Sequence, residues 1–345
     1  MRLFGQAALA DLLKTALFTF GGAALILSFS PRRAEWALAG NALGAGAAIL
    51  VGGAALARAA GAARGGGDME SAPAFFARLL RFSSAYVANS CMVAALLFAS
   101  QWMVNAFGSL AETGLFGMAA QIAQMMLIGV TIFCMVLSPY LSGMWVEGRE
   151  EQARAVLRLA IKGAMMILFA ASVAAWAAMA LILPRWMPEF AGSVPLLPLL
   201  LAAQVCNGSI WTAGMYANLV ERPWLKLWAA AASLASLCAA GFSWAPQFGP
   251  MGAAWAFFAA NAMGLAVTLA YTRRLGLALG RFAPMAIALP AAMAVPGLWA
   301  WAACAAALAA FAFPHLVFDQ AERRMLAETA KRLAILWREK RLGSK

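Results

Sequence analysis

The chain has 345 residues, of which 64% are hydrophobic and 12% are charged, and its formal net charge is +12. Soluble domains are about half apolar and a quarter charged, so this composition excludes a soluble globular protein and predicts an all-α integral membrane protein. The Lys and Arg residues lie in loops and near the C-terminus rather than on one folded soluble face. We therefore expect no nucleic-acid partner.

Residues 1–57 contain two apolar segments, each long enough to span a bilayer, which takes about 20 residues. The first segment carries Asp11 and Lys14, which share a helix face and can pair. Lys14 has two interpretations. It either snorkels to the headgroups or faces a hydrated cavity, since a charge at the centre of a spanning helix costs about 2.5 to 3.5 kcal/mol and is usually functional. Residues 58–82 are rich in Gly and charge, which predicts a cytoplasmic linker between two lobes.

Residues 83–275 contain six further apolar segments, at about 83–104, 114–141, 156–183, 194–219, 225–244 and 250–271. They predict a complete six-helix lobe. Two shorter segments within 282–317 are separated by Pro296 and Gly297 and predict a terminal hairpin. Residues 318–345 predict a basic amphipathic tail on an anionic leaflet. The expected architecture is about ten transmembrane helices, with part of an N-terminal lobe followed by a complete C-terminal lobe.

The charged loops predict the orientation of these spans. Nearly all of the 26 Lys and Arg residues fall on the side that holds both termini. The positive-inside rule then predicts a multi-pass protein of the cell inner membrane with both termini in the cytoplasm.

Polar side chains form a stripe along each of three predicted helices, as their spacing at about 100° per residue indicates. The candidate substrate-path residues are Tyr86, Asn89 and Gln101 on the first helix of the lobe, Gln121 and Gln124 on the second, and Gln204, Asn207, Trp211 and Asn218 on the fourth. One interpretation is hydrogen bonding between helices, worth about 0.6 kcal/mol per pair. The other is a hydrated central cavity, which three stripes running the length of their helices favour.

No catalytic or metal-binding pattern occurs in the sequence. The five cysteines lie singly in apolar segments without CxxC spacing. The predicted outer loops are too short for the folded catalytic segment that a membrane-embedded sugar polymerase or ligase would need. We therefore expect no enzyme activity, no cofactor and no metal.

The run from Ser100 to Arg158 resembles the polysaccharide and O-antigen lipid-carrier flippases of the multidrug/oligosaccharidyl-lipid/polysaccharide exporter superfamily. The similar features are Gly114-Leu115-Phe116, Pro139, Gly148 with the charged stretch after it, the turn at 218–223 and the Pro/Gly-rich entry at 246–254. Many relatives carry an Asp-Arg or Asp-Lys pair where this chain has Ser100 and Gln101. A role for that charged pair is therefore not expected here.

The resemblance implies a flippase that moves an isoprenoid-diphosphate-linked oligosaccharide to the outer leaflet by alternating access. The polar stripes would bind sugar hydroxyls, Trp211 would stack on a sugar ring, and Lys14 and Arg81 would supply cations for the diphosphate. Implied partners are the lipid-linked oligosaccharide, membrane lipids, H⁺ or Na⁺ as a coupling ion, and polysaccharide-assembly proteins.

The resemblance also implies that four helices of the N-terminal lobe are missing. We expect the chain to be an N-terminally truncated reading of a longer gene that does not transport alone. Two other functions stay open: a drug or metabolite exporter of the same superfamily, and a membrane scaffold for polysaccharide assembly, which would not explain the polar stripes.

Overall fold

A computed structural model describes residues 46, 72–280, 282–295, 297–311, 317–318 and 322–323. The side chains of the first long helix are described from Ser84 onward. Lys14, the first two predicted spans and most of the predicted tail lie outside the described residues. The chain divides into two compact units, Met1–Phe76 and Ala77–Lys345. The second unit holds the predicted six-helix lobe.

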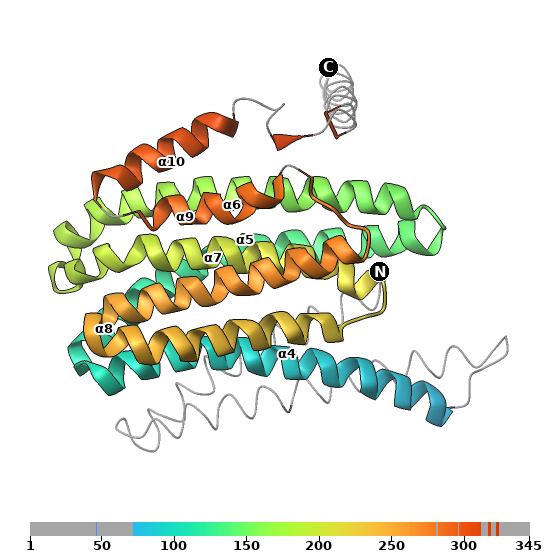
Figure 1. The fold of residues 1–345 in the computed structure, drawn as a ribbon, viewed down its shortest axis with the longest axis horizontal. Helices are drawn as coiled ribbons and strands as arrows, with labels where there is room; N and C mark the ends of the chain where they lie inside the picture. Colours follow the sequence, from blue (N-terminus) through green and yellow to red (C-terminus); the bar gives the residue numbers. More distant parts are fainter. Residues whose placement is uncertain are drawn as a thin grey trace, which may run out of the picture. The chain divides into compact units, whose positions relative to one another are not determined.

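The described residues form helices and no strand (Figure 1). In chain order they are α4 (Ala72–Phe107), α5 (Leu110–Val146), α6 (Glu150–Trp186), the 3₁₀ helix η3 (Pro188–Leu196), α7 (Leu197–Leu219), α8 (Trp224–Arg274), α9 (Phe282–Met293) and α10 (Leu298–Phe311). Within this described part, five helical segments are long and apolar enough to cross a membrane. The protein is therefore a membrane-embedded all-α protein.

Helix α4 begins at Ala72, inside the stretch that the sequence predicts as a linker. The residues that follow Ala72 explain why the helix begins there. Pro73 is the second residue of the helix, where a missing N–H breaks no helical hydrogen bond. The residues that follow are mostly Ala, Phe, Leu and Arg, and Ala, Leu and Arg are strong helix formers.

Helices α5 and α6 form a long antiparallel pair. Each has 37 residues, or about 55 Å, which exceeds the roughly 30 Å hydrocarbon core. The start of α5 is capped reciprocally, because the Ser109 N–H donates to Glu112 Oε2 at 2.7 Å and the Glu112 N–H donates to Ser109 Oγ at 3.2 Å. Gly148, at φ 77°, makes the turn into α6.

Helix α8 is two predicted spans joined by a tight reversal. Its 51 residues fold back at Gly249, whose φ of 57° and ψ of −137° suit only glycine. The halves pack against each other in opposite directions, with Gly241 against Ala256 and Gly264 against Ser233. Figure 1 shows them side by side. The missing side chains of the two helical glycines let the backbones approach closely.

Helix α7 is the centre of the lobe, because it is buried along most of its length and packs against α5, α6 and α8 (Figure 1). Helix α4 lies at the edge and packs on the first half of α8. There Met103 meets Gly241, and the Trp102 and Phe242 rings meet edge to face with centroids 6.4 Å apart. Helices α9 and α10 form the predicted short hairpin, with Gly297 at φ 68° between them.

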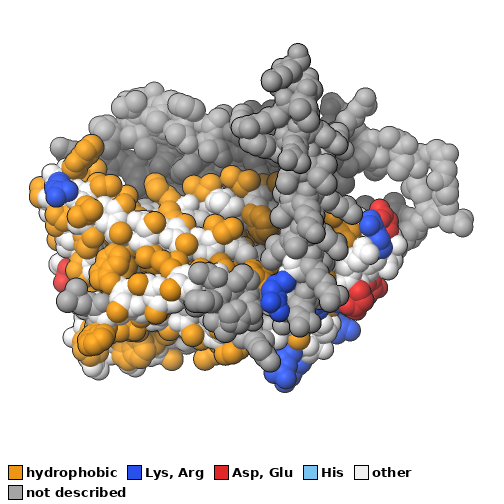
Figure 2. Space-filling view, turned by 90° about the horizontal axis from the view of Figure 1, so that it is seen from above, with side chains coloured by type: hydrophobic (Ala, Val, Ile, Leu, Met, Phe, Trp, Pro, Cys, Tyr) orange, Lys and Arg blue, Asp and Glu red, His pale blue; other side chains and the backbone are white. Residues whose placement is uncertain are grey.

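Charged side chains gather at one end of this lobe, as Figure 2 shows, while its flank is largely apolar. We call this the basic end and define it by the turns at Gly148, Glu221 and Gly276. Among the described residues, Arg185 is the one Lys or Arg at the opposite end. The charge asymmetry expected from the sequence is therefore present in this part of the fold.

Candidate functional site

Two of the predicted path residues interact directly on α7. The Asn207 Nδ2 donates to Gln204 Oε1 at 3.2 Å, one helical turn away. Gln204 is 2% exposed and Asn207 is half-buried. A buried amide needs such partners because leaving it unpaired costs about 1 to 3 kcal/mol. The pair therefore forms a polar point within the central helix of the lobe.

Gln124 on α5 lies at the level of this pair. Gly208 packs against Leu127 and Val130, and the Cys134 Sγ lies 3.9 Å from Thr212 Oγ1, so α5 and α7 run side by side in the same direction. Gln124 on α5 and Gln204 on α7 come about one turn before these contacts.

The Gln124 Nε2 is buried and has no hydrogen-bond partner within the described structure. We call Gln124, Gln204 and Asn207 the polar cluster.

Lys226, near the start of α8, is a cation that the sequence analysis missed. Its Nζ lies 5.4 Å from the centre of the Tyr86 ring on α4, a cation–π distance. Its side chain crosses Gly214 on α7, where an added Cβ would lie 3.2 Å from the Lys226 Cε. Lys226 is half-buried, and among the described residues no carboxylate pairs with it. Within the described part of the chain, the site therefore holds a positive charge that contacts an aromatic ring and no carboxylate.

The cation and the polar cluster occupy the same side of α7. Gly214 comes seven residues after Asn207 and ten after Gln204, so it lies about 20° and about 80° from them around α7. From Gln204 to Gly214 the helix rises by about 15 Å toward the basic end. The arrangement therefore offers amide groups in the middle of the lobe and a cation nearer its basic end.

The other candidate residues are more dispersed. Tyr86 is 52% exposed and meets Lys226, and Asn89, one turn later, is half-buried. Gln121 and Trp211 are exposed and have no described polar partner, and Gln101 is half-buried. Near the basic end, the buried Oδ1 of Asn218 has no hydrogen-bond partner among the described residues. The Arg81 side chain lies outside the described residues. The candidate residues therefore do not gather at one place, and the role predicted for them stays a prediction.

The sequence analysis did not predict a buried ion pair that the structure shows. Lys162 and Glu322 form an ion pair with Nζ and Oε2 2.7 Å apart, and their side chains are 1% and 4% exposed. The sequence predicts that Glu322 belongs to a basic tail on the membrane surface. In the structure Glu322 instead neutralises Lys162, whose side chain is buried. A signal existed, since Lys162 falls six residues inside the predicted span 156–183. Nothing in the sequence named its partner.

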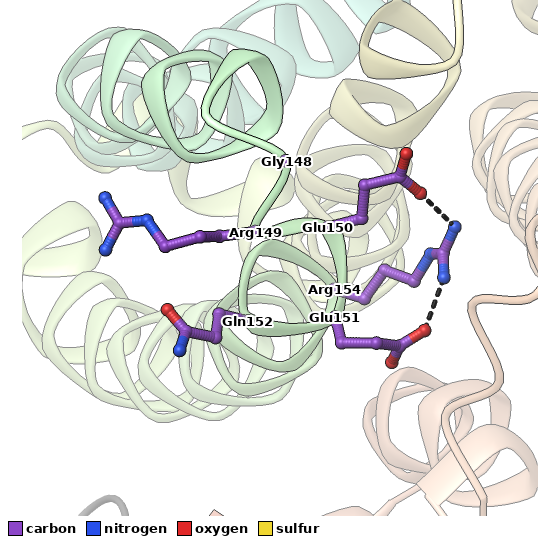
Figure 3. A pocket seen from close by; sticks show the side chains of 6 residues that line it. All are labelled: Gly148, Arg149, Glu150, Glu151, Gln152 and Arg154. Carbon is purple, nitrogen blue, oxygen red and sulfur yellow. Dashed lines mark hydrogen bonds and ion pairs between the residues drawn. The ribbon is translucent and has the colours of Figure 1, made fainter.

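A charged pocket of about 400 Å³ opens at the basic end, at the turn between α5 and α6 (Figure 3). Arg154 dominates it and is already fully engaged. Its guanidinium pairs with Glu150 and Glu151, its Nε donates to the Tyr216 hydroxyl at 3.1 Å, and it lies 5.5 Å from the Trp145 ring centre. The Tyr216 hydroxyl in turn donates to the Leu275 carbonyl at 2.8 Å.

The contacts of Arg154 and Tyr216 join α5, α6, α7 and the end of α8, and we call them the clamp. A structural clamp explains the pocket better than a binding site does. Tyr216 lies about 18 Å along α7 from Gln204, so the clamp is separate from the polar cluster.

The donor groups also decide which cofactors the described part could hold. Across its residues, no three His, Cys, Asp or Glu side chains are grouped as metal ligands would be. The five cysteines are unpaired. The polar cluster and Lys226 are instead suited to hydrogen bonding and to charge neutralisation of a ligand. No protein-family model, no curated protein and no solved structure matches the chain.

Proposed function

We propose that this chain is a lobe of an inner-membrane flippase that moves an isoprenoid-diphosphate-linked oligosaccharide from the cytoplasmic to the outer leaflet. The observation that carries the proposal is Lys226, a half-buried cation without a described carboxylate partner, on the same side of α7 as the polar cluster. The proposed reaction moves its substrate without making or breaking covalent bonds, so the chain would not be an enzyme.

The role proposed for each residue follows from the chemistry of the substrate. Sugars and a diphosphate cannot cross about 30 Å of hydrocarbon without polar partners. Lys226 would neutralise part of the diphosphate through charge-assisted hydrogen bonds. Gln124, Gln204 and Asn207 would exchange hydrogen bonds with sugar hydroxyls while the isoprenoid tail stays in the lipid.

The position of the cation fits loading from the cytoplasm. By the positive-inside rule, the basic end would face the cytoplasm, and both termini would lie there. Lys226 is close to that end, and the polar cluster is deeper by about 15 Å. A substrate entering from the cytoplasmic leaflet would therefore meet the cation with its diphosphate before its sugars reach the amides. A gradient of H⁺ or Na⁺, or of the sugar-lipid itself, would drive the movement.

Two alternatives explain less of the site. A drug or metabolite exporter shares the architecture, but a cation without a counter-charge favours an anionic substrate over a cationic drug. A scaffold for polysaccharide assembly would need the spans but gives no reason for a buried amide donor such as the Gln124 Nε2 to lack a partner.

Ligand binding by the purified chain tests the proposal. We would measure the affinity for an isoprenoid diphosphate, an isoprenoid monophosphate and the neutral isoprenol. The variant Lys226→Met keeps an unbranched stem beside Gly214 but removes the charge. Because a hydrogen bond to a charged group contributes about 1.5 to 3 kcal/mol, diphosphate affinity should fall about tenfold to a hundredfold.

The matched control is Arg222→Gln, which removes an exposed positive charge four residues earlier. It should leave diphosphate affinity near that of the wild type. Equal affinity for the diphosphate and the neutral isoprenol, or an unchanged affinity in Lys226→Met, would remove the basis of the proposal. Binding is the preferred readout because it does not require the chain to complete a transport cycle.

A further inference from the structure

One side of α5 faces away from the rest of the described lobe. The buried residues Ala123, Val130 and Leu141 lie on the side of α5 that packs against α6 and α7. The opposite side carries six residues at spacings that alternate between three and four, and all but the first are exposed. They are Met118, Gln121, Met125, Ile128, Ile132 and Met135. At about 100° per residue they fall within about a third of the helix circumference, and we call them the α5 stripe.

The spacing of the α5 stripe is typical of a contact between two helices. Residues that recur every 3.5 positions form the narrow contact face of helices that cross at about 20° in a left-handed supercoil. Helix pairs in membranes commonly adopt the same geometry. The repeat therefore indicates a helical partner on this side of α5.

Gln121 distinguishes this side of α5 from a lipid-facing surface. Its side chain is exposed within an apolar run and has no polar partner among the described residues. An amide in hydrocarbon is strongly unfavourable because lipid chains offer no hydrogen bond. Helix α6 gives an internal comparison, since its exposed residues between positions 164 and 183 are all Ile, Leu or Ala. Over that span α6 has the composition of a lipid-facing surface, whereas α5 carries an amide that needs a partner within the membrane.

The glycines of α5 support the same interpretation. All four lie on the outward side of the helix, and an added Cβ at each would meet no described atom within 4 Å. They are Gly114, Gly117, Gly129 and Gly143. Glycine is a weaker helix former than alanine, and no close contact within the described lobe offsets that loss. Small residues instead let two helices approach closely in a membrane.

A second copy of the chain is the partner that this side fits. Two copies inserted in the same orientation are related by a twofold axis along the membrane normal, so each residue of the α5 stripe meets its own counterpart. The Gln121 side chain both donates and accepts hydrogen bonds, so two such amides can pair across the axis. Between Glu112 and Glu147 the helix has no charged residue, so no like charges meet there.

We propose that two copies of this chain associate in the membrane through the α5 stripe, with their Gln121 amides hydrogen-bonded across the twofold axis. The stripe lies opposite Val130, which packs near Gly208 of α7, so the contact with the second copy leaves the α5–α7 packing in place. The inference does not depend on the proposed substrate, since no residue of the stripe belongs to the polar cluster or contacts Lys226.

Disulfide cross-linking of the full chain in native membranes tests this contact. In a background with the five cysteines replaced by alanine, Ile132→Cys places one thiol on the α5 stripe. The matched control is Phe133→Cys, because Phe133 is also exposed but lies about 100° further around the helix. With a membrane-soluble oxidant, Ile132→Cys should form a species of twice the 36.3 kDa chain mass. It should do so about tenfold faster than Phe133→Cys, because a disulfide needs Cβ atoms about 4 Å apart.

The variant Gln121→Leu tests the hydrogen bond across the axis. The association constant of the purified chain in detergent should fall about threefold to thirtyfold, the range that interhelical hydrogen bonds in membranes provide. The control Gln101→Leu removes an amide from α4, outside the stripe, and should leave association unchanged.

Three outcomes would overturn the proposal. If Ile132→Cys gives no species of doubled mass, or gives no more than Phe133→Cys, lipid or another part of the same chain covers the α5 stripe. If the Ile132→Cys thiol reacts readily with a water-soluble maleimide before oxidation, this side of α5 lines a hydrated cavity. If Gln121→Leu associates as strongly as the parent chain, the two amides do not pair across a twofold axis.

Discussion

The variant Gln124→Leu distinguishes a substrate path from simple helix packing. The Gln124 Nε2 is buried and has no partner among the residues that the structure describes, so in the ligand-free lobe this amide carries a desolvation penalty of about 1 to 3 kcal/mol. Leucine has a similar size and no polar atom. We therefore expect the free energy of unfolding to stay the same or to rise by about 1 kcal/mol.

Binding should respond in the opposite direction. Loss of one neutral hydrogen bond to a sugar hydroxyl, worth about 0.5 to 1.5 kcal/mol, should lower the affinity for an isoprenoid-diphosphate-linked oligosaccharide about twofold to tenfold. Affinity for the same isoprenoid diphosphate without sugar should not change. The variant should reach the membrane abundance of the parent chain, so that a change in affinity cannot be attributed to a loss of folded protein.

The matched control is Ser172→Ala. Ser172 on α6 is fully buried and its Oγ also lacks a partner, but it lies outside the polar cluster. Its removal should leave stability and oligosaccharide affinity near their starting values. A fall in thermal stability and membrane abundance in Gln124→Leu, with unchanged affinity per folded molecule, would refute the reasoning and assign Gln124 to packing.

Two further predictions concern the fold. Gly252→Ala should lower the free energy of unfolding by at least about 3 kcal/mol, because the new Cβ would lie 2.2 Å from the Trp244 carbonyl oxygen. The control is Gly129→Ala in the middle of α5, where an added Cβ meets no atom within 4 Å, and it should raise the free energy of unfolding by about 0.5 to 1 kcal/mol. If thermal unfolding shows the same change in stability for both variants, the close approach at Gly252 in the α8 turn is wrong. Cysteines placed at Glu112 and Arg185 in a cysteine-free background should both react with an impermeant thiol reagent added outside the cell; labelling only after permeabilisation would reverse the proposed orientation.

The sequence predicted the helices of the lobe well because each is encoded locally. A run of about 20 apolar residues must be helical in a membrane, since only a helix satisfies the backbone within one segment. The reversals were also predictable: Gly249 between Pro246 and Pro250 and Gly297 after Pro296 separate apolar runs. The predicted start of α4 was less accurate, because Ala72 follows a Gly-rich stretch and nothing apolar marks the beginning of the helix.

The site was predictable only in part. Periodicity placed Gln124 and Gln204 on stripes of their own helices, but the choice of which stripes face each other required the parallel packing of α5 on α7 around Gly208. Lys226 follows a charged turn, and from the sequence it is indistinguishable from any loop lysine. Its contact with Tyr86, 140 positions away, and its position over Gly214 depend on how α4, α7 and α8 pack together.

By itself, the sequence determined the class of this protein, the bounds of most spans and the charge asymmetry of the lobe. These properties depend on composition and on short-range periodicity. Tertiary structure alone decided which of two lysines in the lobe pairs with a carboxylate and which, among the described residues, does not. Lys162 meets Glu322 from 160 residues away, whereas Lys226 meets an aromatic ring and no described carboxylate. The physical reason is that a buried charge is defined by its neighbours in space, and those neighbours come from helices that only the packing of the chain brings together.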